Sequence, residues 1–273
     1  MLILILIRYF IDKAYDKKYK IGALLIEPLM LGAGGLKFID PLFQRILVEE
    51  CKKDNIPIVY DEVAVGIYRL GPSTASSILK INPDISVYGK LLSGGYLPIS
   101  VTLATDETYK SFLSDQVAQA LLHGHSYTAN PMGCVAALEA IRLFEKCPQF
   151  DNEKRIMKNS FDENDIKTVS KLPGVRCVMS MGSVFSVELN LLSKTDKNNV
   201  TTHTGYGNTN TSTVVSLLRE ERVYARSLGN VIYLMPSPLA STAEKLRLIR
   251  VLTRVLTKAF YGVPSIPSNN LPV

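Results

Sequence analysis

Short apolar runs alternate with amphipathic stretches through the first half of the chain. Four runs have the length of buried strands and are bounded by polar residues, glycine or proline: 22–27, 56–60, 84–88 and 99–104. The pairs Asp40-Pro41 and Asn130-Pro131 each place a capping residue before a proline, so we predict that helices begin there. Strands that alternate with helices predict an α/β fold with a largely parallel sheet.

The pattern changes beyond about Pro148, where strands and helices no longer alternate regularly. We predict a second, smaller α+β domain that closes with an amphipathic helix over 243–259. The segment 194–213 is rich in Asn, Thr and Gly, which is typical of a surface loop. The other elements expected here are strands at 174–179, 183–189, 223–226 and 231–234 and a helix near 214–221.

The chain starts with the apolar run MLILILI, which Arg8 follows directly. A membrane-spanning helix needs about 20 apolar residues, and a secretory signal peptide carries a basic segment before its apolar one. The run matches neither pattern. We therefore predict a buried strand or a ragged chain start, and no membrane partner.

Composition narrows the class of protein further. Of the 273 residues, 47% are hydrophobic and 21% are charged, as in globular proteins, which excludes wholesale disorder, collagen and coiled coil. The formal net charge of +6 is spread along the chain without an aromatic-interleaved basic cluster, so we expect no nucleic-acid partner. The cysteines contain no Cys-x-x-Cys pair, which excludes a zinc ribbon and favours a reducing compartment; they are Cys51, Cys134, Cys147 and Cys177.

Two charged positions follow predicted strands and are candidates for chemistry. Asp61-Glu62 ends the run 56–60, so at least one carboxylate is expected at the mouth of that strand. Lys90 lies in a glycine-flanked loop after the run 84–88, where a lysine can act as an amine nucleophile or base. The structural alternative is that Asp61 caps its strand and Lys90 is a solvated loop charge.

Several spaced motifs together resemble the class III pyridoxal-phosphate aminotransferases. They are Ile26-Glu-Pro-Leu-Met-Leu-Gly-Ala-Gly-Gly35, Asp61-Glu-Val-Ala-Val-Gly66 with Arg69, Gly89-Lys90 with Gly94-Gly95, and His123-Gly-His-Ser-Tyr-Thr-Ala-Asn-Pro131. The resemblance implies a fold type I transferase. We expect the chain to divide into three parts. These are a partial, mostly parallel-sheet large domain that binds the cofactor (1–148), a smaller α+β C-terminal domain (149–262) and a loose tail (263–273).

The resemblance also implies roles for individual residues around pyridoxal 5′-phosphate. Lys90 would hold the cofactor aldehyde covalently and carry the proton during transamination. Asp61 would pair with the protonated pyridine nitrogen and keep the ring cationic. Val63 would pack against the ring face, and the Ser126 hydroxyl would reach the phosphate of the neighbouring subunit's cofactor, so a homodimer is expected.

The resemblance implies substrate contacts in several of these motifs. Arg226 matches the arginine that pairs with a substrate carboxylate, a role suited to a planar bidentate cation. Tyr233, Arg69, Gly124 and His125 lie in matching motifs and are expected in the substrate site. His123 and His125 look metal-like, but a metal site needs three or four ligands and no third is visible, so we expect no metal.

Two further sequence motifs indicate which members of the family this chain resembles most. Val223-Tyr-Ala-Arg226 with Gly229-Asn-Val-Ile-Tyr-Leu-Met-Pro236, and Gly94-Gly-Tyr-Leu-Pro-Ile-Ser-Val-Thr-Leu-Ala104, resemble the members that act in biotin synthesis. These convert 8-amino-7-oxononanoate to 7,8-diaminononanoate with S-adenosylmethionine as the amino donor. The alternatives are a member acting on an ω-amino acid, such as ornithine or 4-aminobutyrate, and a non-catalytic relic or assembly partner.

The resemblance runs from about Ile21 to Arg254, and the family's N-terminal part has no counterpart. That part supplies a phosphate loop and an aromatic residue stacked on the cofactor ring. We therefore expect a fragment that holds the covalent lysine and the pyridine carboxylate but only half of the cofactor cradle. The expected location is the cytoplasm, with the mitochondrion as the alternative.

Overall fold

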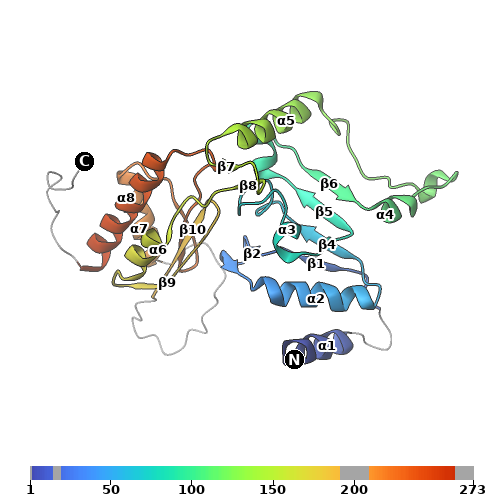
Figure 1. Cartoon of the computed structure of the whole chain (residues 1–273), viewed down its shortest axis with the longest axis horizontal. Coiled ribbons are helices and arrows are strands. Elements are labelled where there is room, and N and C mark those ends of the chain that lie inside the picture. Colours follow the sequence, from blue (N-terminus) through green and yellow to red (C-terminus); the bar gives the residue numbers. More distant parts are fainter. Residues whose placement is uncertain (1, 15–19, 191–208, 262–273) are drawn as a thin grey trace. The chain divides into compact units, whose positions relative to one another are not determined.

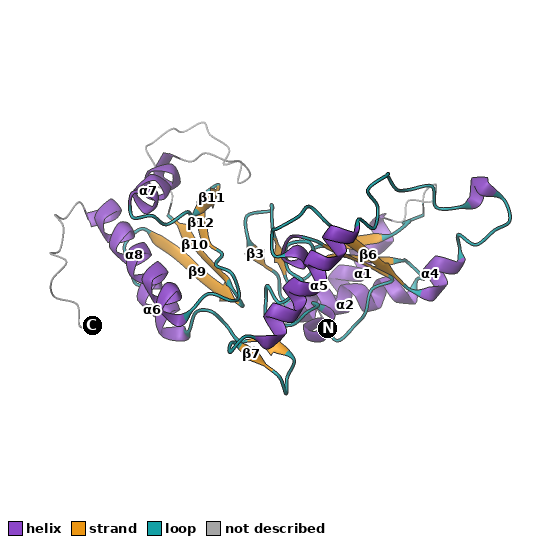
Figure 2. Ribbon diagram, turned by 90° about the horizontal axis from the view of Figure 1, so that it is seen from above, coloured by secondary structure: helices purple, strands orange, loops and turns teal. Residues whose placement is uncertain are grey.

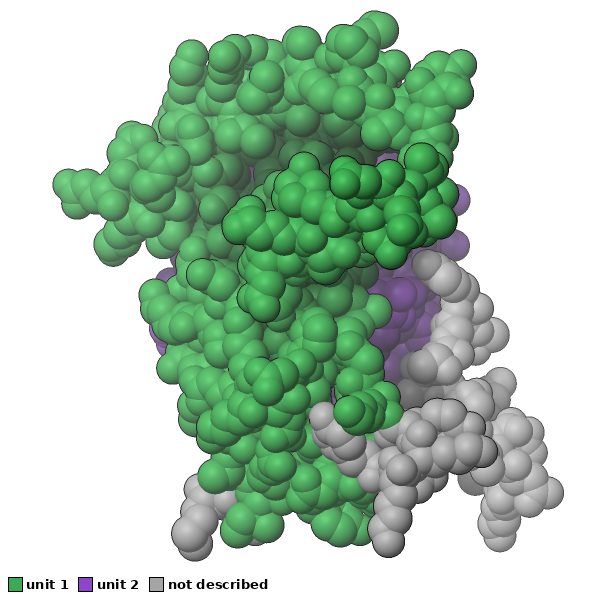
Figure 3. Space-filling view, turned by 90° about the vertical axis from the view of Figure 1, so that its right-hand side faces the viewer, with its two compact units in different colours: residues 1–32, 37–158 green, residues 33–36, 159–273 purple. Residues whose placement is uncertain are grey.

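The computed structural model describes residues 2–14, 20–190 and 209–261. The chain divides into two compact units, one formed by residues 1–32 and 37–158 and the other by 33–36 and 159–273, coloured separately in Figure 3. Each is described by itself below. The domain boundary predicted near residue 148 stays a prediction, and the division between units lies at Lys158.

Unit 1 is built on a four-stranded sheet with the order β1-β4-β5-β6 (Figure 1). Strands β1 (Leu24–Ile26), β4 (Ile58–Asp61) and β5 (Ile85–Tyr88) are parallel, and β6 (Val101–Ala104) runs antiparallel at the edge. Three of these strands lie within predicted apolar runs, and β4 extends one residue beyond the run 56–60, to Asp61. The largely parallel sheet is confirmed.

Two helices of unit 1 begin at the predicted capping signals. Helix α2 (Pro41–Lys53) starts after Asp40, whose Oδ1 accepts hydrogen bonds from the N–H groups of Leu42 and Phe43. Helix α5 (Pro131–Lys146) starts in the same way after Asn130. Such a cap satisfies main-chain donors that have no partner within the first turn.

The remaining elements of unit 1 are short. One of them, the 3₁₀ turn η1, follows β5 and packs against helix α5. The elements are α3 (Ser76–Leu79), α4 (Asp106–Lys110), η1 (Lys90–Ser93), η2 (Val117–Gln119) and the hairpin strands β2 (Met30–Leu31), β3 (Lys37–Phe38), β7 (Phe150–Asp151) and β8 (Ile156–Met157).

The prediction for the chain start was wrong. The residues expected as a strand or a ragged end form helix α1 (Leu2–Ala14), which packs on α2. Ile7 and Ile11, one helical turn apart, are buried, and Arg8 forms an ion pair with Asp54 of 2.9 Å. Apolar residues continue after Arg8 with Tyr9, Phe10 and Ile11, so Leu2–Ala14 has the spacing of buried positions expected of a helix.

Unit 2 has a four-stranded antiparallel sheet with the order β11-β12-β10-β9 (Figure 2). Its strands are β9 (Val175–Met181), β10 (Val184–Leu189), β11 (Arg226–Leu228) and β12 (Val231–Leu234), and its helices are α6 (Glu163–Ser170), α7 (Thr209–Glu220) and α8 (Thr242–Tyr261).

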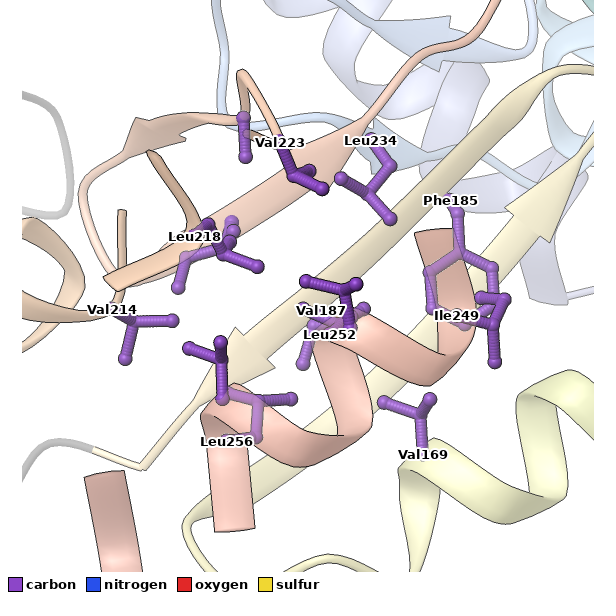
Figure 4. Close-up of a cluster of buried hydrophobic side chains, with 14 of the residues drawn as sticks. Val169, Phe185, Val187, Val214, Leu218, Val223, Leu234, Ile249, Leu252 and Leu256 are labelled. Atoms are coloured by element: carbon purple, nitrogen blue, oxygen red, sulfur yellow. The ribbon is translucent and has the colours of Figure 1, made fainter. Parts of the chain in front are cut away.

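The core of unit 2 lies between its helices and its sheet. Figure 4 shows Leu218 of α7 and Leu252 of α8 among the side chains packed around Phe185 and Val187 of β10. Helices that cover an antiparallel sheet form an α+β unit, as predicted.

Two details of the predicted second domain differ from the structure. The strand predicted over 223–226 starts only at Arg226, because Val223 and Ala225 turn into the core before the strand begins. Residues 209–213 of the predicted loop are the start of α7. The rest of that loop, 194–208, and the predicted tail 263–273 lie outside the described residues.

Candidate active site

Asp61 and Lys90 lie at the carboxyl ends of neighbouring parallel strands. Asp61 is the last residue of β4 and is in register with Val87 of β5. Lys90 is the first residue of η1, which follows β5 after Gly89, and its side chain is exposed. Lys90 has a φ of 47°, in the left-handed region that residues other than glycine seldom adopt. Such backbone strain is frequent where a side chain is held for function.

The Asp61 carboxylate is oriented by the turn that follows it. Its Oδ1 accepts a hydrogen bond of 3.1 Å from the N–H of Val63. Within the described residues, Oδ2 accepts no hydrogen bond and the carboxylate has no ion pair. One oxygen is therefore fixed by the protein, and the other is available to a ligand.

Val63 connects this turn to the lysine loop. A Cβ on Gly89 would lie 3.4 Å from Cγ1 of Val63, an ordinary van der Waals distance. The Val63 side chain thus lies beside the residue immediately before Lys90. Asp61, Val63 and Lys90 therefore form one local cluster in unit 1.

Glu62, between Asp61 and Val63, points away from the strand mouth. Its side chain is only 1% exposed, and its Oε1 accepts hydrogen bonds from the hydroxyls of Thr74 (2.7 Å) and Tyr88 (3.0 Å). Burial raises the pKa of the Glu62 carboxyl, and the hydrogen bonds that it accepts oppose this shift. Of the two adjacent carboxylates, Asp61 is thus the one presented at the mouth of β4.

Arg69 lies in the interior of unit 1. It is 9% exposed, and burial lowers its pKa to about 10. It belongs to the turn after Glu62, where Ile67 and Tyr68 have φ values of 50° and 65°. A substrate contact by Arg69 remains a prediction.

Gly124, His125 and Ser126 lie together in an exposed segment between η2 and α5. The segment is ordered by local bonds: His125 Nδ1 accepts from the N–H of Tyr127 at 3.1 Å, and the His125 N–H donates to the Thr128 hydroxyl at 3.0 Å. Within the described residues, no hydrogen bond or ion pair joins this segment to Asp61 or Lys90. The roles predicted for Gly124, His125 and Ser126 therefore stay predictions.

Arg226 and Tyr233 belong to unit 2. They are register partners in the antiparallel pair β11–β12, so their side chains share one face of that sheet. Arg226 is exposed and Tyr233 is half-buried. The two residues assigned to substrate binding from separate motifs are therefore neighbours.

Neither a metal-binding cluster nor a membrane-spanning helix is found in the part of the chain that the structure describes. No group of three or more His, Cys, Asp and Glu side chains there is arranged to hold a metal ion. None of the helices among those residues has both the length and the apolarity needed to cross a membrane.

A profile of the aminotransferase class-III family matches residues 5–256. The chain belongs to this family. Among its curated relatives is the rice bifunctional dethiobiotin synthetase/7,8-diamino-pelargonic acid aminotransferase, mitochondrial. It is 44% identical over 243 residues, which cover 87% of this chain and 28% of the relative. The adenosylmethionine-8-amino-7-oxononanoate aminotransferase of Anoxybacillus flavithermus is 34% identical, over 83% of this chain and 48% of its own length.

Solved structures agree with the family assignment. The adenosylmethionine-8-amino-7-oxononanoate aminotransferase of Methanocaldococcus jannaschii matches with a TM-score of 0.71 and 28% identity, over 86% of this chain and 53% of that one. An aminotransferase of Bacillus anthracis gives a TM-score of 0.75 at 21% identity, over 92% of this chain and 56% of that one, a likeness of fold alone. The chain spans about half, or less, of the length of these proteins. The fold class predicted from the sequence is confirmed.

Class III aminotransferases of this fold depend on pyridoxal phosphate. The donor set at the carboxyl ends of β4 and β5 fits that cofactor. Lys90 offers an exposed primary amine for an aldehyde, and Asp61 has a carboxylate oxygen left for a protonated ring nitrogen. Val63 offers an apolar surface beside them.

Sequence reasoning missed Glu62 and Tyr88 as parts of this arrangement. The only sequence signal for them was their position, Glu62 directly after Asp61 and Tyr88 two residues before Lys90. Their hydrogen bond joins residues 26 positions apart in the chain, a contact that no local pattern predicts.

Proposed function

We propose that this chain serves as a pyridoxal-phosphate-dependent aminotransferase that converts 8-amino-7-oxononanoate to 7,8-diaminononanoate, with S-adenosylmethionine as the amino donor. The observation that carries the proposal is the similarity to relatives named for this reaction, at 44% and 34% identity over most of the chain. Because the chain spans only part of those relatives, activity of this chain by itself is part of the proposal.

Lys90 and Asp61 have complementary roles in the proposed reaction. When bound, pyridoxal phosphate supplies an electron-withdrawing ring that stabilises negative charge at the substrate carbon losing a proton. The Lys90 amine would hold the cofactor through its aldehyde, and as a free base it would take and return the proton at that substrate carbon. The Asp61 carboxylate holds the proton of the ring nitrogen, which keeps the ring positively charged.

The surroundings of Asp61 suit this role. The Val63 N–H bond fixes one carboxylate oxygen, so the other has a defined direction. A group that is already oriented needs no reorganisation when charge develops during the reaction. Val63 lies against Gly89 and provides an apolar surface for one face of the ring.

Unit 2 would recognise the substrate. Arg226 is exposed on β11 and opposite Tyr233, so the guanidinium is free of the core and next to a phenol. A guanidinium binds a carboxylate through two parallel hydrogen bonds, which suits the carboxylate of 8-amino-7-oxononanoate. Gly124, His125 and Arg69 are proposed as further substrate contacts.

A homodimer is part of the proposal. Ser126 lies in the exposed segment before α5, and its hydroxyl would bind the phosphate of the partner subunit's cofactor. For the location, the rice and Arabidopsis thaliana relatives are both named as mitochondrial proteins, which supports the mitochondrion over the cytoplasm.

No observation favours an ω-amino-acid substrate. The ornithine δ-aminotransferase of Plasmodium falciparum has a TM-score of 0.74 but only 22% identity, a likeness of fold. The test below therefore includes ornithine and 4-aminobutyrate as alternative amino donors. A non-catalytic role corresponds to its negative result.

The test supplies the full chain with pyridoxal phosphate and 8-amino-7-oxononanoate, and adds one amino donor at a time. Mass spectrometry should detect 7,8-diaminononanoate with S-adenosylmethionine but not with ornithine or 4-aminobutyrate. Product with an ω-amino acid alone would support the other subfamilies. A folded chain that makes no product with any donor would leave the non-catalytic role.

A further inference from the structure

Glu62 lies behind the candidate site, in the interior of unit 1. Besides the hydroxyls of Thr74 and Tyr88, it accepts a hydrogen bond of 2.7 Å from the N–H of Ala75. A buried carboxylate needs such donors because it has lost its water. The position of the carboxylate and the positions of these three donors therefore depend on one another.

Two of the bonds of Glu62 reach the strand that leads to Lys90. The Glu62 N–H donates to the carbonyl oxygen of Val87 at 2.9 Å, and the Glu62 side chain accepts from the Tyr88 hydroxyl at 3.0 Å. Only Gly89 separates Tyr88 from Lys90. The end of β5 is thus held through both its main chain and a side chain.

The Tyr88 ring is held from a second direction. A Cβ on Gly66 would lie 2.8 Å from Cδ1 of Tyr88, so the ring occupies the space that a side chain at residue 66 would need. The ring is therefore enclosed between Gly66 and the Glu62 carboxylate. Its hydroxyl is the only polar atom of that side chain, and it donates a hydrogen bond to Oε1 of Glu62.

Asp61 is attached to the same support. It directly precedes Glu62, and its carboxylate is oriented by the N–H of Val63, which directly follows. Any displacement of Glu62 would move both neighbours. Glu62 is therefore connected to both groups of the proposed chemistry, covalently to Asp61 and through Tyr88 to Lys90.

We propose that Glu62 is a positioning residue, which fixes Lys90 relative to Asp61 through the hydroxyl of Tyr88. This proposal rests on the proposed function for its purpose, but the physical link can be tested without the cofactor. The competing explanation is that Glu62 only stabilises the turn that ends at Thr74 and Ala75.

Two matched variants separate these explanations. Tyr88→Phe and Thr74→Val each remove one hydroxyl donor to the same oxygen, Oε1, and leave the bond from Ala75 in place. Tyr88→Phe keeps the ring that packs against Gly66. Tyr88→Phe breaks the direct hydrogen bond between Glu62 and the strand before Lys90, whereas Thr74→Val keeps both of its partners.

The first readout is hydrogen exchange of the full chain without cofactor. The amides of Leu92 and Gly94 are hydrogen-bonded within η1, to Gly89 and Leu91, and report on the Lys90 turn. Tyr88→Phe should speed their exchange about tenfold, whereas Thr74→Val should leave them near the wild-type rate and speed exchange around Ala75 instead. Equal exchange of the Lys90 turn in the two variants would overturn the proposal.

The second readout is the rate at which borohydride fixes pyridoxal phosphate on Lys90. We expect a drop of about fivefold or more in Tyr88→Phe and a wild-type rate in Thr74→Val, at equal folded fraction by circular dichroism. A wild-type rate in Tyr88→Phe would also overturn the proposal. If the wild-type chain captures no cofactor, the proposed function fails, and the exchange measurement still decides whether Glu62 fixes the Lys90 turn.

Discussion

The ring of Tyr88 lies directly over Gly66, so that a Cβ at residue 66 would be 2.8 Å from Cδ1 of the tyrosine and 3.0 Å from the carbonyl oxygen of Glu62. Neither neighbour can move easily, because Tyr88 is buried and the Glu62 carbonyl already accepts the N–H of Gly66 at 2.8 Å. We expect Gly66→Ala to destabilise unit 1 by about 1–3 kcal/mol, as overpacking of a buried site does.

Pulsed labelling of the buried thiol of Cys51 in increasing urea measures this loss within unit 1. Gly95→Ala is the matched control, because a Cβ there meets no atom within 4 Å, although its φ of 87° will produce some strain. Gly66→Ala should lower the urea midpoint more than Gly95→Ala. The opposite order would contradict the packing described here.

The stability of unit 1 should depend on pH through Glu62. Burial raises the pKa of this carboxyl, so the folded chain binds a proton there more readily than the unfolded chain does. Stability from this group is therefore greatest below the ordinary pKa of a glutamate and is lost as the pH rises through the raised value. The titratable neighbours Tyr60 and Tyr88 also have pKa values raised by burial and stay neutral in this range.

The comparison with Glu62→Gln isolates this effect, because glutamine does not titrate. The difference in unfolding free energy, wild type minus variant, should become more favourable to the wild type as the pH falls from 7 toward 4.5. Disulfide exchange of Cys51 with dithiodipyridine, which reacts in acid, follows unfolding over this range. A difference that shrinks on acidification would show that Glu62 is not a buried carboxylate of this kind.

Local signals were enough to predict much of unit 1 from the sequence. The strands β4 and β5 and the start of α2 depend on residues within a few positions of one another, such as Asp40 and the two amides it caps. The position of Asp61 and Lys90 after neighbouring strands followed from the same alternation. Parallel strands then bring their carboxyl ends to one edge of the sheet.

Features set by tertiary packing were not predictable in this way. Helix α1 was predicted as a strand or ragged end because seven apolar residues show no helical period, and its burial depends on contact with α2. Which of Asp61 and Glu62 faces inward depends on the pleat of β4 and on partners far along the chain, at Thr74 and Tyr88. The sequence alone contains no marker of those contacts.

Asp61→Asn should impair the proposed chemistry while leaving the fold intact. The amide can still accept the N–H bond of Val63, but it carries no charge to hold a proton on the cofactor ring. We expect the half-reaction with S-adenosylmethionine to slow by about 100-fold or more, measured by single-turnover absorbance changes. An unchanged rate would remove Asp61 from the mechanism. The matched control is Asp115→Asn, because Asp115 is exposed. Asp84→Asn is less suitable, since the Asp84 carboxylate accepts a hydrogen bond from the N–H of Ile58 in β4.

Arg226→Lys should weaken binding of the carboxylate substrate more than it slows turnover. Lysine keeps the charge but loses the two parallel N–H donors of a guanidinium. We expect the KM for 8-amino-7-oxononanoate to rise about 10-fold to 100-fold, with kcat nearly unchanged. Arg219→Lys, at an exposed position of α7, is the matched control. A normal KM in Arg226→Lys would exclude this arginine from substrate binding.

Covalent capture of pyridoxal phosphate is the most direct test of the proposal that Lys90 holds the cofactor. The full chain is incubated with pyridoxal phosphate, reduced with borohydride and digested, and labelled peptides are identified by mass spectrometry. We expect a pyridoxyl group on Lys90 at far higher occupancy than on another exposed lysine, such as Lys146, and none at residue 90 in Lys90→Arg. A folded chain whose Lys90 is labelled no more than Lys146 would contradict it.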